Sequence, residues 1–472
     1  MLDPSLFDKI LLHKDVKPCI VANTYLHILD QRRELFEKYN LSAKERILQS
    51  IRFKLVILVR VFQTIFYKKY STKQKNIKSN VLFVSHLTNS QQLFQDHDAY
   101  FGDLPNQLIQ SGMSASIALI NHVKANNLHR SRVWKDSKVQ RFVLNLSLGF
   151  LSEIKLYFSQ RKSKKRLNSI LKELKIDKIE TKNILNNQFS ANTFAALRIA
   201  KQVTDIAEKT GAKFIITTYE GHAWERLVYY YARKLNPSIK CFGYQHAAVF
   251  ENQHAIKRSL GSLYNPDIIL TSGKISKSIL NECKLLRNLK IVCLGSPKYI
   301  NPNVITDKVD CCLVVPEGTV KECLYLFELS YFYAIQNQNQ NFIWRFHPLL
   351  SFEKIKKFSA IFKKLPKNIS LSNGDFDEDV QKSDSVLYRG STAVINAINA
   401  GLRPIYYQQS IDEISIDPIY QLIKGKEFVS NQKQLKLAFN EDIDSETRQS
   451  LQDFAQDFYS PLDVQVLKQV II

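Results

Sequence analysis

The sequence predicts an α/β protein of two Rossmann-like, doubly wound domains that face each other across a cleft. The chain has 472 residues, which is more than one ordinary hydrophobic core accommodates. From residue 80 onward, apolar strand-like runs alternate with segments of helix length, and this alternation favours βαβ units around a parallel sheet. The alternation is interrupted by a segment with Pro and Asn residues at 296–310 and then begins again. We therefore expect a hinge at 296–310.

Residues 1–78 are expected to form a helical, basic region ahead of the first sheet. Within it, 51–70 mixes apolar side chains with Arg52, Lys54 and Arg60. A basic amphipathic helix of this kind can lie on an anionic membrane leaflet. A helix packed on the core, with its cations in water, fits the same pattern. The sequence leaves both interpretations open.

The two domains are predicted at 79–295 and 311–440, followed by a helical tail at 441–472. In the first domain we expect strands at 81–85, 116–121, 213–218 and 240–245, and helices at 104–110, from about 161 to 174, 193–209 and 223–234. In the second we expect strands at 311–315, 341–346, 385–388 and 404–407, and helices at 321–336, 351–365 and 392–400. Ligands of doubly wound sheets bind at the carboxyl ends of strands, so the candidate site residues are sought there.

One such strand end in the first domain reads Glu220-Gly221-His222. Gly221 permits a tight turn and close approach of a ligand. A partly buried Glu220 at this place suits a general base, although it could instead cap its own helix. His246 ends the next strand and could line the same cleft, with packing as its alternative role. These residues form the predicted acceptor side of the site.

Two strand ends of the second domain carry Glu317-Gly318 and Arg345-Phe346-His347-Pro348. Glu317 could accept hydrogen bonds from a ribose or a base, or cap the helix that follows. Pro348 holds His347 in an extended conformation, where the imidazole could donate to a phosphate or could simply pack against its neighbours. Arg345 offers a phosphate fork.

A further strand end carries Gly390-Ser391-Thr392 at a helix start, which is typical of a phosphate cradle or of a plain N-cap. Asp375 and Asp377 spell a D-x-D pattern, but their context indicates the acidic first turn of a helix. We therefore predict no metal site and no cofactor.

Taken together, these motifs resemble bacterial GT-B transferases that use CMP-activated ulosonic acids, including sialyltransferases and Kdo transferases of capsule and O-antigen synthesis. The resemblance covers roughly 210–407. It implies that Glu220 is the base, that His347 and Ser391/Thr392 hold the donor phosphate, and that Glu317 contacts the donor. That family usually has two consecutive acids, and Tyr219 stands at the first of them here. Transferases of CDP-polyol phosphates share the His-Pro feature and are the runner-up.

The composition indicates which kinds of partner and which cellular compartment to expect. The formal charge of +22 favours phosphates, nucleic acid or an anionic membrane face. Seven cysteines without a C-x-x-C pair suit a reducing compartment, and the N-terminus does not read as a signal peptide. We expect a cytoplasmic transferase, peripheral on the inner membrane, that takes a nucleotide-sugar donor and a glycan or lipid-linked glycan acceptor.

Two other activities compete with this prediction. A sugar-nucleotide epimerase can share the two-domain fold and would need no acceptor. A non-enzymatic protein that binds RNA or membrane would explain the net charge and the basic run at 161–166, but no RNA-binding motif accompanies that run. We therefore expect no nucleic-acid partner.

Overall fold

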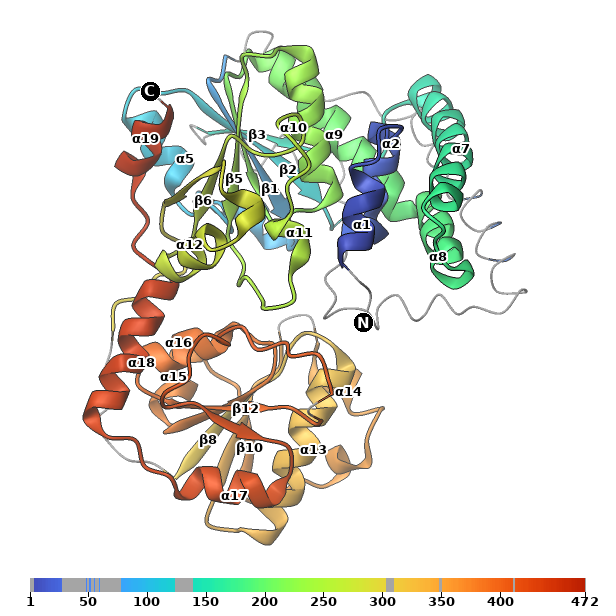
Figure 1. Cartoon of the computed structure of the whole chain (residues 1–472). Coiled ribbons are helices and arrows are strands. Elements are labelled where there is room, and N and C mark those ends of the chain that lie inside the picture. The colour runs from blue at the N-terminus through green and yellow to red at the C-terminus, as the bar shows by residue number, and fades with distance from the viewer. Residues whose placement is uncertain are drawn as a thin grey trace.

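The computed structural model describes residues 4–27, 48, 51, 55, 59, 78–123, 139–302, 310–347, 350–410 and 412–471. Within these residues the chain forms two entirely parallel β-sheets, each packed between layers of helices (Figure 1). The predicted α/β class with two doubly wound domains is confirmed. The expected helix at 51–70, part of the hinge and Pro348 lie mostly or wholly outside the described residues.

The first sheet has the strand order β3-β2-β1-β4-β5-β6-β7. Its strands are β1 (Val81–Leu87), β2 (Ala115–Asn121), β3 (Gln140–Val143), β4 (Phe214–Thr218), β5 (Lys240–Gln245), β6 (Ile268–Thr271) and β7 (Lys290–Cys293). Its helices are α5 (Leu104–Gln110), α7 (Phe150–Glu173), α8 (Lys178–Gln188), α9 (Ala191–Thr210), α10 (Ala223–Leu235), α11 (His254–Lys257) and α12 (Lys274–Asn281). Alternate residues of β1 pack into opposite cores, Leu82 into one and Phe83 into the other. The sheet is therefore buried on both faces, as its continuous apolar strands require.

The second sheet has the order β10-β9-β8-β11-β12-β13. Its strands are β8 (Cys311–Val315), β9 (Asn341–Trp344), β10 (Ile369–Leu371), β11 (Ser385–Tyr388), β12 (Arg403–Tyr407) and β13 (Glu427–Val429). Its helices are α13 (Val320–Gln336), α14 (Phe352–Ile355), α15 (Phe376–Gln381), α16 (Ala393–Asn399) and α17 (Gln432–Asn440). Here too, Cys312 and Leu313 of β8 face opposite cores.

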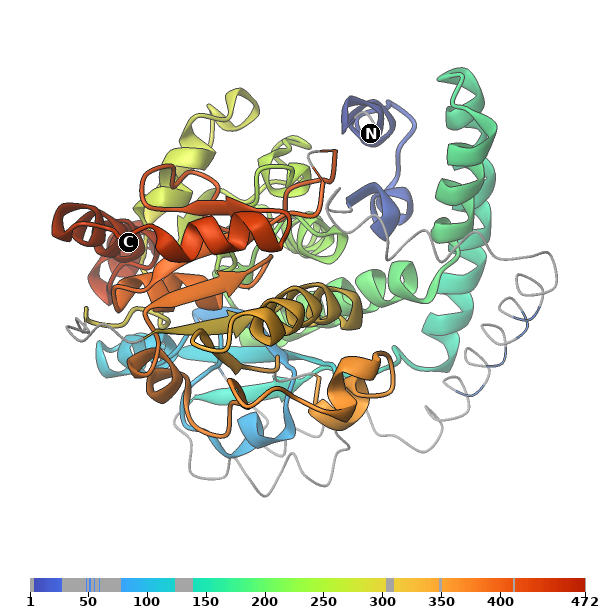
Figure 2. The same cartoon turned by 90° about the horizontal axis from the view of Figure 1, so that it is seen from below.

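The end of the chain joins the two domains. α18 (Ser445–Phe458) packs on α16 of the second domain and on α12 of the first. α19 (Val464–Ile471) returns to the first domain, where Leu467 enters the core beside α5 (Figure 1). Lys274 on α12 forms an ion pair of 2.6 Å with Asp457 on α18. The N-terminal helices α1 (Pro4–Leu11) and α2 (Pro18–Val21) also pack on the first domain, and Figure 2 shows them between its body and α7.

Several sequence predictions need correction. The strands β3, β6, β7, β10 and β13, each of three or four residues, were not predicted, because such short runs carry little pattern. α7 begins at Phe150, before the predicted start. The helix predicted at 351–365 is wrong: the segment forms α14 and a 3₁₀ helix at Ala360–Lys363. Between them Ser359 is extended, and its hydroxyl donates to Glu328 on α13 at 2.8 Å.

In the described part of the chain, no helix combines the length and the hydropathy that a membrane-spanning segment requires.

Candidate functional site

The turn between β4 and α10 carries the first predicted motif, Glu220-Gly221-His222. Gly221 has a positive φ of 82°, and the backbone of Ala255 on α11 lies directly against it. His222 is the N-cap of α10, and Glu225 completes a capping box. The Glu225 carboxylate accepts hydrogen bonds from the backbone N–H groups of Glu220 at 3.1 Å and His222 at 2.8 Å. Glu225 therefore fills the capping role that the sequence left open for Glu220.

The Glu220 carboxylate lies between two imidazoles. Its Oε1 is 3.6 Å from Nε2 of His246, and its Oε2 is 3.7 Å from Nε2 of His222. The Glu220 side chain keeps 23% of its surface exposed, so a hydroxyl group arriving from solvent can reach it. Burial raises the pKa of the neighbouring Glu225 well above its usual value, and the charge of Glu220 raises it further. Glu225 is therefore the buried carboxyl group that caps the helix, and Glu220 is the partly exposed one.

Three side chains near His246 were not predicted from the sequence: His86, His122 and Tyr100. His86 lies in β1, with Nδ1 3.0 Å from Nε2 of His122 and Nε2 2.9 Å from the Thr218 hydroxyl. The Tyr100 ring stands edge-on to the His246 ring, with centroids 4.9 Å apart. The sequence contained a signal for both histidines, because His86 is near the end of one strand and His122 directly follows the next strand.

The buried histidines of this cluster are neutral at physiological pH. Burial lowers the pKa of His246 to about 4, although the Glu220 charge opposes the shift. Burial also lowers the pKa of His86 well below its usual value, and the neighbouring imidazoles lower it further. Glu220 therefore faces an uncharged His246, and a carboxylate in this setting can accept a proton from a bound hydroxyl.

This depressed pKa predicts a loss of stability in mild acid. His246 titrates near pH 4 when folded, against an ordinary value of 6.5. The unfolded chain therefore binds more protons between these pH values, and stability falls as the pH falls. From pH 7 to pH 5 this group should cost about 2 kcal/mol, measurable by urea denaturation. His246→Asn should flatten the pH dependence, whereas the exposed His97→Asn should leave it unchanged. Equal slopes in all three proteins would contradict the prediction.

At the carboxyl edge of the second sheet, three predicted turns meet. Gly318 lies so close to the His347 ring that a Cβ on it would stand 2.8 Å from His347 Nδ1. Gly390 has a φ of 70°, and a Cβ there would stand 3.4 Å from the Glu317 carboxylate. Glu317, Gly318, His347 and Gly390 thus form one cluster, which we call the second-edge cluster. Its members come from three separate strand-to-helix turns, as the sequence predicted.

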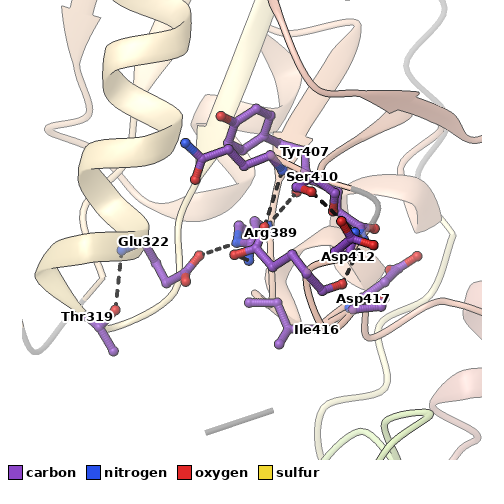
Figure 3. Close-up of polar contacts among 12 residues, drawn as sticks. Thr319, Glu322, Arg389, Tyr407, Ser410, Asp412, Ile416 and Asp417 are labelled. Carbon is purple, nitrogen blue, oxygen red and sulfur yellow. Dashed lines mark hydrogen bonds and ion pairs between the residues drawn. The ribbon is translucent and has the colours of Figure 1, made fainter. Parts of the chain in front are cut away.

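A buried arginine holds the turn that leads to Gly390 (Figure 3). Arg389 is 2% exposed; its Nε lies 2.5 Å from Glu322 on α13, and its Nη2 lies 2.5 Å from Glu413. Its Nη1 also donates to the Tyr407 carbonyl at 3.2 Å. Burial raises the pKa of Glu322 to about 6, against the opposing effect of Arg389. This network could not be predicted from the sequence, because its members are far apart along the chain.

Glu317, Ser391 and Thr392 were also expected either to contact a ligand or to cap a helix. Thr319 is the N-cap of α13, where its hydroxyl accepts from the Glu322 N–H at 3.3 Å, so this helix does not use Glu317 as a cap. Thr392 occupies the N-cap position of α16, but among the described residues its side chain makes no capping hydrogen bond. The Ser391 hydroxyl accepts from the Ala393 N–H at 3.4 Å.

Arg345 is engaged within the second domain. β9 ends at Trp344, one residue before it. Arg345 Nη1 donates to Asp379 at 2.6 Å, to the Ser372 hydroxyl at 2.9 Å and to the Gly374 carbonyl at 3.0 Å. These contacts hold Arg345 in place, and the phosphate fork stays a prediction.

The acidic D-x-D segment begins a helix, as predicted. Asp375 is the N-cap of α15, and Asp377 lies in its first turn. Within the described residues, no group of three or more His, Cys, Asp or Glu side chains is arranged to hold a metal ion.

The cluster of Glu220, His222 and His246 lies on the side of the first domain that meets the second domain. Ala248 follows His246 by two residues and is buried in the apolar core that contains β8, β11 and α16. Lys298, from the hinge, is close enough to His246 for its charge to lower the pKa of that imidazole. The carboxyl ends of parallel strands share one edge of a sheet, so Glu220, His222 and His246 all belong to the edge whose loop touches the second domain.

No family model matches the sequence, and no curated protein matches it significantly. Among solved structures, the glycosyltransferase SnogD from Streptomyces nogalater aligns with 10% identity and a TM-score of 0.47, over 83% of this chain and 99% of that one. A glycosyltransferase from Rickettsia africae aligns with 14% identity and a TM-score of 0.46, over 83% and 97%. The UDP-GlcNAc 2-epimerase from Methanocaldococcus jannaschii aligns with 12% identity and a TM-score of 0.44, over 80% and 98%. These similarities are too low to transfer an activity to this chain.

Proposed function

We propose that the protein is a glycosyltransferase that moves a sugar from a nucleotide-activated donor to a glycan acceptor. The observation that carries this proposal is the position of Glu220. Its carboxylate is partly exposed, is relieved of helix capping by Glu225, and lies against the neutral His246. A second set of polar groups occupies the carboxyl edge of the other sheet, so the two halves of a transfer reaction each have a candidate location.

In the proposed reaction, Glu220 takes the proton of an acceptor hydroxyl. The hydroxyl oxygen forms a bond to the anomeric carbon of the donor sugar, while the bond from that carbon to the nucleotide phosphate breaks. The electron pair leaves with the phosphate oxygen. His347 and the hydroxyls of Ser391 and Thr392 would bind this phosphate, stabilising the charge that develops on it.

The acceptor and donor sides differ in the groups they offer. His222, His246 and Gly221 would border the acceptor, since they surround Glu220. Glu317 would accept hydrogen bonds from the nucleoside, and Gly318 lets the His347 ring approach closely. We extend the proposal to a CMP-linked ulosonic acid as donor and to capsule or O-antigen synthesis as the process; these details rest on the resemblance of the sequence motifs.

Nucleotide binding tests the donor side directly. A nucleotide at 100 times its Kd should stabilise the native state by about 2.7 kcal/mol, which corresponds to a rise in Tm of roughly 5–10 °C for a domain of this size. We expect CMP to give this rise and CDP, UDP and GDP to give less. His347→Ala should reduce the rise, whereas the exposed His97→Ala should not. A rise with UDP alone would overturn the CMP donor while leaving the transferase proposal intact.

The competing activities have distinct signatures. An epimerase would convert the nucleotide sugar without any acceptor, so product formation that depends on added glycan would exclude it. A polyol-phosphate transferase would be stabilised best by CDP and would transfer phosphate together with its polyol. A non-enzymatic RNA-binding protein would show salt-dependent RNA binding that His347→Ala leaves unchanged.

A further inference from the structure

α7 lies on the outer flank of the first domain (Figures 1 and 2) and carries a stripe of exposed apolar side chains. One face of α7 is packed on the domain through Leu156, Leu167 and Ile170. The first turns of the opposite face present large apolar side chains to solvent. Leu151 is 70% exposed and Phe158 is 61% exposed, and Phe150 and Ile154 are also exposed. Such clustering is unusual for a solvated helix, because apolar side chains in water are normally scattered singly.

Cations continue the same face of α7. Lys155, Arg161, Lys162 and Lys165 are all exposed. Spacings of three and four residues connect them with Leu151 and Phe158, so they share one side of the helix. The face therefore changes from apolar to basic along its length.

The acidic side chains of α7 do not cancel this charge. Glu153 is buried and is held by Arg198 at 2.7 Å. Glu173 lies at the far end of the helix, 3.4 Å from His13. Between them, 154–172 contains no acid.

A second apolar stripe is present before the first sheet. Leu48, Ile51, Leu55 and Val59 are helical and exposed, and their spacing of three or four residues puts them on one side of a helix. Lys and Arg residues occur between them in the sequence, as on α7. Two exposed apolar stripes, each with cations nearby in the sequence, indicate that the protein meets a surface with both apolar and anionic character.

We infer that the exposed face of α7 docks on an anionic lipid leaflet. Phe150, Leu151, Ile154 and Phe158 would enter the boundary between headgroups and acyl chains, and the cations would meet anionic headgroups. RNA would satisfy the cations but would leave Leu151 and Ile154 in water. The net charge of +22 attracts the whole protein to the same leaflet.

The position of α7 relates this surface to the candidate site. β3 runs parallel to β2, so the segment that leaves β3 and enters α7 starts from the carboxyl edge of the sheet, the edge that carries Glu220. A docked α7 would hold that edge near the membrane, where a lipid-linked acceptor would be found. The docking itself does not depend on the proposed transfer reaction.

Vesicle flotation with the full chain tests the inference. We expect binding to phosphatidylcholine vesicles that contain phosphatidylglycerol, and little binding to phosphatidylcholine alone. Lys162→Glu with Lys165→Glu should lower the partition coefficient about tenfold or more, with a weaker effect at high salt. Leu151→Ser with Phe158→Ser should lower it to a similar degree at all salt concentrations, because burial of apolar area is lost without a change of charge.

Matched variants on α17 serve as controls. Lys433→Glu with Lys436→Glu removes two exposed lysines from the second domain, and Leu437→Ser changes an exposed apolar residue there. Both should bind vesicles like the unchanged protein, and unaltered Tm values would show that all variants fold. Loss of binding in the α17 variants, or full binding by the Leu151/Phe158 variant, would overturn the inference. So would RNA binding that depends on the α7 lysines while vesicles are not bound.

Discussion

Glu220→Gln is expected to lower the rate of sugar transfer about 10³-fold, since a missing general base typically costs 10²- to 10⁴-fold. Glutamine keeps the size of the side chain and one of its acceptor oxygens but cannot take the proton of an acceptor hydroxyl. The capping box should survive, because it uses only the backbone N–H of Glu220. The loss should therefore appear in kcat, with little change in Tm or in KM for the donor. Steady-state kinetics with a nucleotide sugar and a glycan acceptor would measure it.

Glu353→Gln provides the matched control, because Glu353 lies on α14 and its side chain is 70% exposed. It should leave kcat unchanged. Activity close to normal in Glu220→Gln would remove the proposed base. It would not affect the nucleotide-binding test, which depends on the other domain.

Gly221→Ala is expected to destabilise the first domain by about 4 kcal/mol. Two effects add: an alanine at φ 82° costs about 1–2 kcal/mol, and overpacking typically adds 1–3 kcal/mol. The new Cβ would overlap the carbonyl group of Ala255 and stand 2.6 Å from the Ile256 nitrogen. Both obstacles are backbone atoms of α11, which no rotamer change can move. Urea or thermal denaturation would show the loss.

Gly211→Ala separates the two causes. Gly211 ends α9 with a φ of 68°, and a Cβ there would meet nothing within 4 Å. Gly211→Ala should lower the free energy of unfolding only by the cost of the positive φ, about 1–2 kcal/mol. Equal losses in the two variants would show that the contact between Gly221 and α11 is unimportant, and that the turn holding Glu220 is less constrained than its geometry implies.

The sequence by itself determined the fold class and the places of most of the longer strands. β5, β8 and β11 have the predicted bounds, because strands buried on both faces read as continuous apolar runs. It also located the turns that contain Glu220, Glu317, His347 and Gly390, because each follows such a run and includes or adjoins a residue suited to a turn. These are local signals, in which a few neighbouring residues settle the backbone.

Only the tertiary structure decided which side chains meet. His86 contacts Thr218 from 132 residues away because β1 lies beside β4 in the sheet, and strand order is not encoded in either strand alone. Which of Glu220 and Glu225 caps the helix likewise depended on how the turn folds. Arg389 pairs with Glu322 and Glu413 because distant segments pack together. Local pattern specifies secondary structure, but the neutral histidines and the buried ion pairs follow from burial, which arises only when the sheets and helices assemble.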